Sequence, residues 1–471
     1  FYLHLINMKT FKYLLIISIF ILLANNIYIT AQTKNIDSAL TALKNYKQED
    51  TGKVLLMKDI CKGLGKQKPD EGLKYGKEAL ELSQRLNYTR GIAEVLNSIG
   101  TVYYYKANYD SALNYYLKAE TKYKETTDKL GLAKSLNNIG LIYDIKGDYS
   151  KSLGYYLQSL KILESLDDKK LLGTTYNNIG LVYMKQTNLP DYLDKSLDFF
   201  KKSLKIREDL GDKAAIASSY YNLGLVYLQK GNKLKRLDEK NKNIYLLYDT
   251  ALMYSNKSLN IYNEIKDIRG LATVYPNIAN IYGSKKDYKK SEEFYVNAIK
   301  LQQQTGDIAN LAYSLFNVGV LNTEQKNYDK AIEYYKKSLI YADSLNIKTL
   351  RRDCYDRMAS TYSFANRYKE AFECMLKYSE LKDEILNEES SKMITEMQTK
   401  YETDKKAKEI EILNLAMSKQ KIWNYALIGG IILVLIIALI SINSYIQKRK
   451  DNKIIAAEKA KSDALLLNTL P

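Results

Sequence analysis

The sequence has very few residues that break helices or carry redox and acid–base chemistry. Its 471 residues include 4 prolines, 22 glycines, 3 cysteines and a single histidine. Few helix breakers, together with many Leu, Ile, Lys and Tyr residues, favour an all-α fold. The net charge of +17 comes from Lys and Arg interspersed with Asp and Glu, so there is no clustered basic face to indicate nucleic-acid binding.

The one histidine, His4, precedes Met8, which we take as the start of translation because the chain opens on Phe1. The mature protein would then lack histidine, which excludes His-based acid–base catalysis, His-ligated metal and a phosphoacceptor His within this chain. The cysteines are widely separated and have no CxxC spacing: Cys61, Cys354 and Cys374. They fit small buried hydrophobes better than a redox or metal site.

No catalytic constellation is present. The sequence contains no phosphate-binding loop, no GxSxG, no metal-ligand cluster and no kinase nucleotide motif. We therefore predict no catalytic residues, no metal and no cofactor in this chain.

Two apolar runs predict the topology. After Met8, a positive segment, a short apolar core (Tyr13–Ala24) and Ile29-Thr30-Ala31 predict a signal peptide at 8–31, with an uncleaved anchor as the alternative. The uncharged run 423–446 is long enough to cross a hydrocarbon core of ~30 Å, and the basic residues 447–450 follow it. We expect a single-pass inner-membrane protein with 32–421 periplasmic and the C-terminus cytoplasmic.

The middle of the chain repeats itself. LNSIGTVY, LNNIGLIY and YNNIGLVY recur with glycines at Gly100, Gly140 and Gly180, a step of 40 residues. We call these glycines the marker positions. The corresponding residues of the other units are Ile60, Gly224, Ala279, Gly319 and Ala359, and insertions precede Gly224 and Ala279. About eight units follow from this spacing.

Each unit contains two amphipathic helices. In the third unit, Leu132, Leu136, Ile139 and Tyr143 form one helical stripe, and Gly147-Asp148 ends that helix. A second stripe contains Tyr149, Leu153, Tyr156, Leu157 and Leu160. Gly140 is expected to let the second helix approach the backbone of the first. Ser152 and Ser159 are expected to serve the same close packing as Ala112 and Ala331, and the tyrosines to form the core.

The small and aromatic positions of these units resemble the tetratricopeptide repeat across 37–386. The period of 40 differs from the usual 34, and the closing proline is absent, so the match is to a longer-helix variant found in peptide-sensing bacterial regulators. The resemblance implies a tetratricopeptide-repeat superhelix with a concave groove. Pro276 lies within a first helix and predicts a kink or a late helix start there.

One polar column lies two residues before the markers, and it starts at Ser98. The candidate ligand-binding residues in it are Asn138, Asn178, Asn222, Asn277, Asn317 and Arg357. In the peptide-sensing relatives this position tends to face the groove, where an amide can pair with a peptide backbone. The alternative is that each Asn bonds across to a neighbouring repeat.

The charged stretch 387–421 lacks Gly and Pro and predicts one long juxtamembrane helix. Ile394, Met397 and Tyr401, then Ile410, Leu413 and Met417, form a broken coiled-coil seam that suits a homodimer. A solvated spacer helix is the alternative.

The cytoplasmic linker 447–471 ends in EKAKSDALLLNTLP. This segment resembles the one that leads into the catalytic domain of class III adenylate/guanylate cyclases, through Ser462, Asp463, Leu465, Leu466, Leu467, Asn468, Leu470 and Pro471. Three consecutive leucines on so short a tail also predict that the chain is truncated before a missing domain. The alternative is a natural C-terminus that lies on the membrane surface.

Together these features predict a membrane-anchored sensor that binds a peptide or protein and relays the event to a cyclase domain absent from this chain. The alternatives are the input module of a sensor histidine kinase and a non-enzymatic, membrane-anchored interaction scaffold.

Overall fold

The computed structural model describes the backbone of residues 36–187 and 189–468, and the side chains of this range except 386–408 and 463–468. Within these ranges every regular element is a helix, which confirms the all-α prediction. The predicted signal peptide at 8–31 lies outside the described residues. So do the side chains of Ile394, Met397 and Tyr401, and those of the closing leucines.

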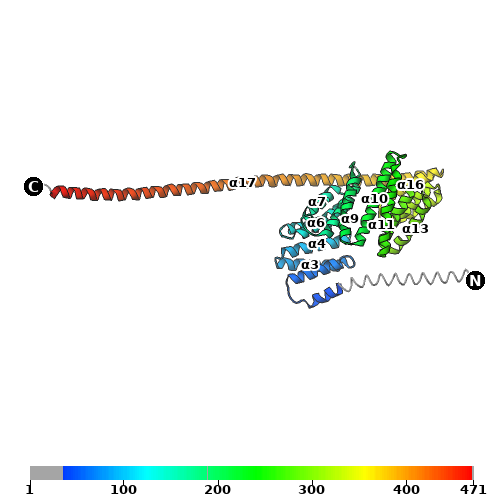
Figure 1. The fold of residues 1–471 in the computed structure, drawn as a ribbon, viewed down its shortest axis with the longest axis horizontal. Helices are drawn as coiled ribbons and strands as arrows, with labels where there is room; N and C mark the ends of the chain where they lie inside the picture. Colours follow the sequence, from blue (N-terminus) through cyan, green and yellow to red (C-terminus); the bar gives the residue numbers. More distant parts are fainter. Residues whose placement is uncertain (1–35, 188, 469–471) are drawn as a thin grey trace, which may run out of the picture. The chain divides into compact units, whose positions relative to one another are not determined.

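The helices pair in chain order, and each pair is one repeat unit. A short helix at 36–45 comes first. The pairs are α2 (Thr51–Leu64) and α3 (Pro69–Arg85), α4 (Thr89–Tyr105) and α5 (Tyr109–Lys124), α6 (Lys129–Ile145) and α7 (Tyr149–Leu163), α8 (Lys169–Lys185) and α9 (Tyr192–Asp209), α10 (Lys213–Leu237) and α11 (Asn243–Glu264), α12 (Ile268–Ser284) and α13 (Tyr288–Thr305), α14 (Ile308–Glu324) and α15 (Tyr328–Ser344), and α16 (Lys348–Phe364) and the start of α17 (Tyr368–Asn468). Neighbouring pairs stack against each other in sequence order (Figure 1). The predicted eight-unit superhelix is confirmed.

A buried aromatic ring covers the marker glycine in several units. A Cβ on Gly140 would lie 2.9 Å from atoms of the Tyr156 ring. The same contact recurs between Gly100 and Tyr116, Gly180 and Phe200, and Gly319 and Tyr335. The second helix thus approaches the backbone of the first closely at these positions, as expected, and it does so through an aromatic side chain. At Gly224 the neighbours do include a backbone carbonyl, that of Ala251.

Serines on the second helices tie the two helices of a unit together. Ser152 Oγ donates to the carbonyl of Gly140, and Ser159 Oγ to that of Ala133, each at 2.8 Å. The same bond joins Ser196 to Gly180, Ser203 to Gly173, Ser291 to Ala279 and Ser338 to Ala312. A carbonyl oxygen has two lone pairs, so it can accept this bond in addition to its helical one. The hydroxyls thus pack as closely as alanine without being left unpaired.

The turn within the third unit lies where the sequence predicts it. Gly147 has a φ of 77°, and the carboxylate of Asp148 accepts a hydrogen bond from the N–H of Lys151 at 3.0 Å. The left-handed residue ends α6, and the Asp side chain caps α7.

Pro276 does not delay the start of its helix. Helix α12 begins at Ile268 and contains Pro276 in its interior, so the predicted late start is wrong. Proline has no N–H to offer the carbonyl four residues earlier, which is that of Ala272. The side chain of Gln302, on α13, donates to this carbonyl instead, at 3.3 Å. A neighbouring helix therefore supplies the hydrogen bond that proline cannot make.

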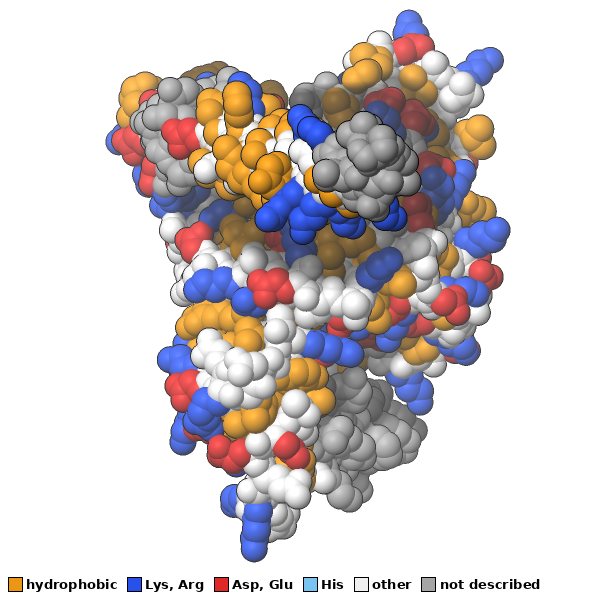
Figure 2. Space-filling view, turned by 90° about the vertical axis from the view of Figure 1, so that its left-hand side faces the viewer, with side chains coloured by type: hydrophobic (Ala, Val, Ile, Leu, Met, Phe, Trp, Pro, Cys, Tyr) orange, Lys and Arg blue, Asp and Glu red, His pale blue; other side chains and the backbone are white. Residues whose placement is uncertain are grey.

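Lysines at the ends of first helices pair with acids near the start of second helices in the preceding unit. The Nζ of Lys106 lies 2.6 Å from Oδ1 of Asp70, and the Nζ of Lys146 lies 2.5 Å from Oδ1 of Asp110. Acidic and basic side chains are intermingled over the face of the array drawn in Figure 2. Exposed pairs of this kind each contribute at most about 1 kcal/mol, so they adjust the stacking of units without determining it.

The second compact unit of the chain starts at Leu376 and is helical up to Asn468. Its segment Glu409–Ser462 is long and apolar enough to cross a membrane. Trp423 and Leu427 are among its exposed large apolar side chains. Ile410, Leu413 and Met417, from the predicted seam, are exposed as well.

Candidate functional site

The first helices form the inner side of the repeat stack. Successive first helices contact one another, as α6 does α8 and α12 does α14, whereas pairs of second helices in the described array make no comparable contact. A stack held closer on one side curves toward that side. The asparagine column therefore lies on the helices of the concave side.

Two members of the column bond across to the neighbouring repeat, as the alternative interpretation predicted. Asn138 Nδ2 donates to Asn97 Oδ1 at 3.1 Å, and Asn222 Nδ2 donates to Asn177 Oδ1 at 2.8 Å. The acceptor in each case is one position earlier in its own unit than the column. Both bonds join first helices of adjacent units, so these amides have a structural role.

The other members are placed differently. Asn277 is buried and donates to Ser255 Oγ on α11 at 3.0 Å. Asn178 and Asn317 are half-buried, and Arg357 is exposed. The column is thus not one continuous ladder: Asn222 and Asn277 are buried, whereas Asn138 is half-buried like Asn178 and Asn317 and has surface left for a ligand, as Arg357 does.

We expect Asn222→Ala to lower the free energy of unfolding by about 1–2 kcal/mol, because it leaves the buried Asn177 Oδ1 with only its longer bond, from Arg207. Asn178→Ala should change it by less than about 0.5 kcal/mol, as is usual for a side chain without such a bond. Urea unfolding followed by circular dichroism compares the two single variants. Equal stability of both variants would show that the cross-repeat bond is unimportant.

Arg207 completes a polar cluster that sequence reasoning missed. Its Nη1 donates to Ser219 Oγ at 2.8 Å and to the Ala215 carbonyl at 3.1 Å, and lies 3.5 Å from Asn177 Oδ1. Burial lowers the pKa of this guanidinium. The signal in the sequence was an arginine where other units carry the buried Tyr123 or Leu163. The cluster links α8, α9 and α10 through hydrogen bonds.

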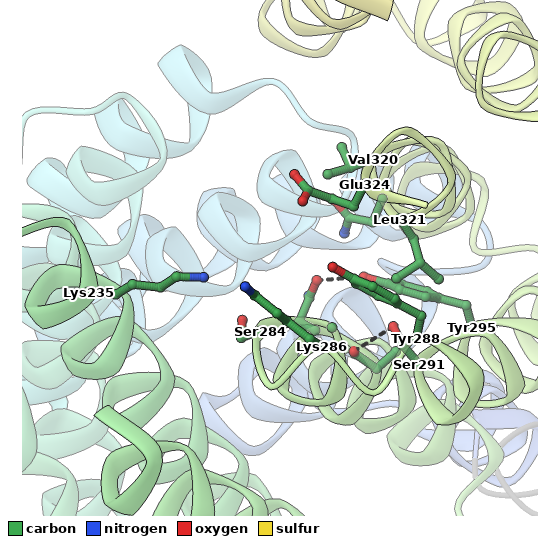
Figure 3. A pocket seen from close by; sticks show the side chains of 13 residues that line it. Lys235, Ser284, Lys286, Tyr288, Ser291, Tyr295, Val320, Leu321 and Glu324 are labelled. Carbon is green, nitrogen blue, oxygen red and sulfur yellow. Dashed lines mark hydrogen bonds between the residues drawn. The ribbon is translucent and has the colours of Figure 1, made fainter. Parts of the chain in front are cut away.

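A pocket of about 240 Å³ opens beside Asn317, between α12, α13 and α14 and the end of α10. Figure 3 shows Lys235 and Lys286 pointing toward each other across it, with Glu324 on the α14 side. Tyr295 Oη donates to Asn280 Oδ1 at 2.5 Å in its wall, and burial raises the pKa of this phenol. The pocket therefore presents two ammonium groups, one carboxylate and several neutral polar groups.

The length of α10 creates this pocket. Helix α10 has 25 residues, whereas the first helices α8 and α12 have 17 each. The additional turns belong to the insertion NKLKRLDEKNKN and carry Lys235 to the pocket. The sequence showed the insertion, but not that it contributes to a site with Asn317.

Residues 64–125, 91–165 and 270–342 match the family model of the tetratricopeptide repeat. These segments are tetratricopeptide repeats. Among curated proteins, the uncharacterized protein ycf37 of Cyanophora paradoxa is 36% identical over 67 residues, 14% of this chain and 38% of that protein. Response regulator aspartate phosphatase I of Bacillus subtilis is 29% identical over 103 residues, 22% of this chain and 26% of that protein. The match to this chain thus spans well under half the length of each of these relatives.

Solved structures share the tetratricopeptide fold over most of the chain. Aspartyl phosphate phosphatase F from Bacillus subtilis has a TM-score of 0.51 at 15% identity, over 75% of this chain and 91% of its own. A Rap protein complexed with competence and sporulation factor has a TM-score of 0.51 at 17% identity, over 77% of this chain and 97% of its own. At such low identities the likeness concerns the fold alone.

The tetratricopeptide array holds its cysteines as buried thiols. Burial raises the pKa of Cys61 to about 12 and that of Cys354 to about 11, so both stay protonated at neutral pH. Cys374 is buried as well. No group of three or more His, Cys, Asp or Glu side chains that could hold a metal occurs in the part of the chain that the structure describes.

Proposed function

We propose that this chain is a membrane-anchored sensor whose tetratricopeptide repeats bind a peptide or protein outside the cytoplasm. The observation that carries the proposal is the charged pocket between α12, α13 and α14, where the lengthened α10 brings Lys235 to Asn317. The Rap structure, which shares the fold, is a complex with competence and sporulation factor, and this supports a peptide or protein ligand.

The pocket is suited to one side chain of a longer ligand. Lys235 and Lys286 can make charge-assisted hydrogen bonds to a carboxylate, while Glu324 can accept from an N–H. The two ammonium groups outnumber the single carboxylate, so an acidic ligand group is favoured. A volume of about 240 Å³ is too small for a whole peptide. The rest of the ligand would lie along the first helices, where Asn178 and Arg357 present amide and guanidinium groups to a peptide backbone.

We expect the double substitution Lys235→Ala and Lys286→Ala to weaken ligand binding by at least about tenfold, because a hydrogen bond to a charged group contributes about 1.5–3 kcal/mol. A library of acidic peptides, screened against the full chain in lipid nanodiscs, would supply the ligand. Lys240→Ala with Lys242→Ala is the matched control, since both lysines are exposed in the same insertion. Equal losses in the two double variants would contradict a role for the pocket.

The signal would pass through α17, which runs from the last repeat into the apolar segment without a break. Ligand binding can shift such a relay only through different affinities for its two states. The resemblance of the tail to a cyclase leader supports a cytoplasmic cyclase as the recipient, with a histidine kinase or a scaffold as alternatives. Sequencing the gene beyond Pro471 separates them: a metal-binding Asp motif, a phosphoacceptor His helix or a stop codon.

A further inference from the structure

In the regular repeats, the next unit's first helix covers the ring that lies over the marker position. Tyr156 packs against Ile179 and Val182, two aliphatic residues of α8. The same arrangement joins Tyr116 to Ile139 and Ile142, Phe200 to Leu223 and Val226, Tyr295 to Val318 and Leu321, and Tyr335 to Met358 and Tyr362. All five rings are almost wholly buried.

In the part of the chain that the structure describes, the last unit has no such cover. Met375 occupies the position of Tyr335 in the preceding unit, yet it is 51% exposed, against 0% for Tyr335. Phe372 occupies the position of Ile332, and it is 64% exposed, whereas Ile332 is 4% exposed. Tyr368 is exposed too, whereas Cys374, on the side of α17 that packs against α16, is buried. We call Tyr368, Phe372 and Met375 the end patch.

The opposite end of the array cannot supply the missing cover. Helix α2 carries Asp59 and Lys62, both exposed, where α4 carries the aliphatic residues Ile99 and Val102. The helix at 36–45 also packs on the first unit, through Leu43. Because this end is polar, head-to-tail stacking of arrays would place charged groups on the apolar end patch.

We propose that the end patch is a homodimer interface, paired with the end patch of a second copy around a two-fold axis. A two-fold interface requires a surface that complements itself, and an uncharged apolar patch meets this requirement. The exposed Lys369 and Glu373 flank it with charges of both signs, so a lysine of one copy can meet a glutamate of the other. The proposal does not depend on ligand binding, and it assigns dimerisation to the array as well as to the seam predicted further along α17.

The test is the mass of the full-length chain in lipid nanodiscs and in detergent, measured by analytical ultracentrifugation. Wild type should sediment as a dimer of the 54.2 kDa chain. Phe372→Glu with Met375→Glu should raise the dissociation constant by at least about 100-fold, since it would bury unpaired carboxylates at the interface centre. Leu246→Glu is the matched control, because Leu246 on α11 is also 64% exposed. It should leave the dimer intact.

A second measurement keeps the proposal testable if the double variant misfolds. Tyr368→Cys should form an intermolecular disulfide under mild oxidation, because the native cysteines are all buried. Tyr245→Cys, exposed on α11, should not. A monomeric wild type, a dissociation constant that the double substitution leaves unchanged, or equal cross-linking at both cysteines would overturn the proposal.

Discussion

Gly140→Ala is expected to lower the free energy of unfolding by about 2 kcal/mol, the range typical of overpacking a filled core. The added Cβ would lie 2.9 Å from two atoms of the Tyr156 ring and 3.1 Å from its Cγ. The ring is fully buried and packs against Ile179 and Val182 of the next repeat, so it cannot move without disturbing that contact. The loss should therefore exceed the gain in helix propensity, about 1 kcal/mol, that alanine brings.

Gly154→Ala, on the partner helix α7 of the same unit, is the control. Nothing lies within 4 Å of a Cβ at this exposed position, so alanine should stabilise the array by about 0.5–1 kcal/mol. Urea unfolding of both single variants gives the comparison, and the changes should have opposite signs. If Gly140→Ala were neutral or stabilising, the ring-over-glycine contact would not be what requires glycine.

Gln302→Leu should cost about 1–2 kcal/mol of stability, because it removes the donor that reaches the Ala272 carbonyl beside Pro276. The other amide atom, Oε1, has no partner in the described structure, so glutamine serves here through its donor. Leucine fills a similar volume, and Leu163 stands at the corresponding position of an earlier repeat. The substitution therefore tests the hydrogen bond more than the packing.

The Pro276→Ala background should abolish this cost. With alanine at 276 the backbone N–H can bond the Ala272 carbonyl, so this carbonyl keeps a donor when Gln302→Leu removes the amide. The coupling between the two substitutions should equal that cost, about 1–2 kcal/mol, measured as a double-mutant cycle of thermal or urea unfolding. Equal costs in both backgrounds would mean that Gln302 acts through something other than the carbonyl beside the proline.

The asparagine column shows how far sequence reasoning reached at the candidate site. The repeat step placed Asn138 and Asn222 correctly on first helices. Whether they face a ligand or a neighbouring unit depends on the offset between adjacent helices, and the structure pairs each with the asparagine one position before the column. The pocket was even less accessible to prediction, since Lys235 and Asn317 meet only because α10 extends beyond its neighbours.

The sequence by itself determined the all-α class, the helix pairs and their number, because amphipathic stripes, turn residues and marker spacing all act within one unit of 40 residues. Only the tertiary structure decided what covers each glycine, which serines and asparagines are bonded, and where the array leaves polar and apolar groups uncovered. These outcomes depend on contacts between units, where an offset of a single residue changes which side chains meet. Gly140 required a close neighbour from its sequence alone, but it took the fold to show that this neighbour is the ring of Tyr156.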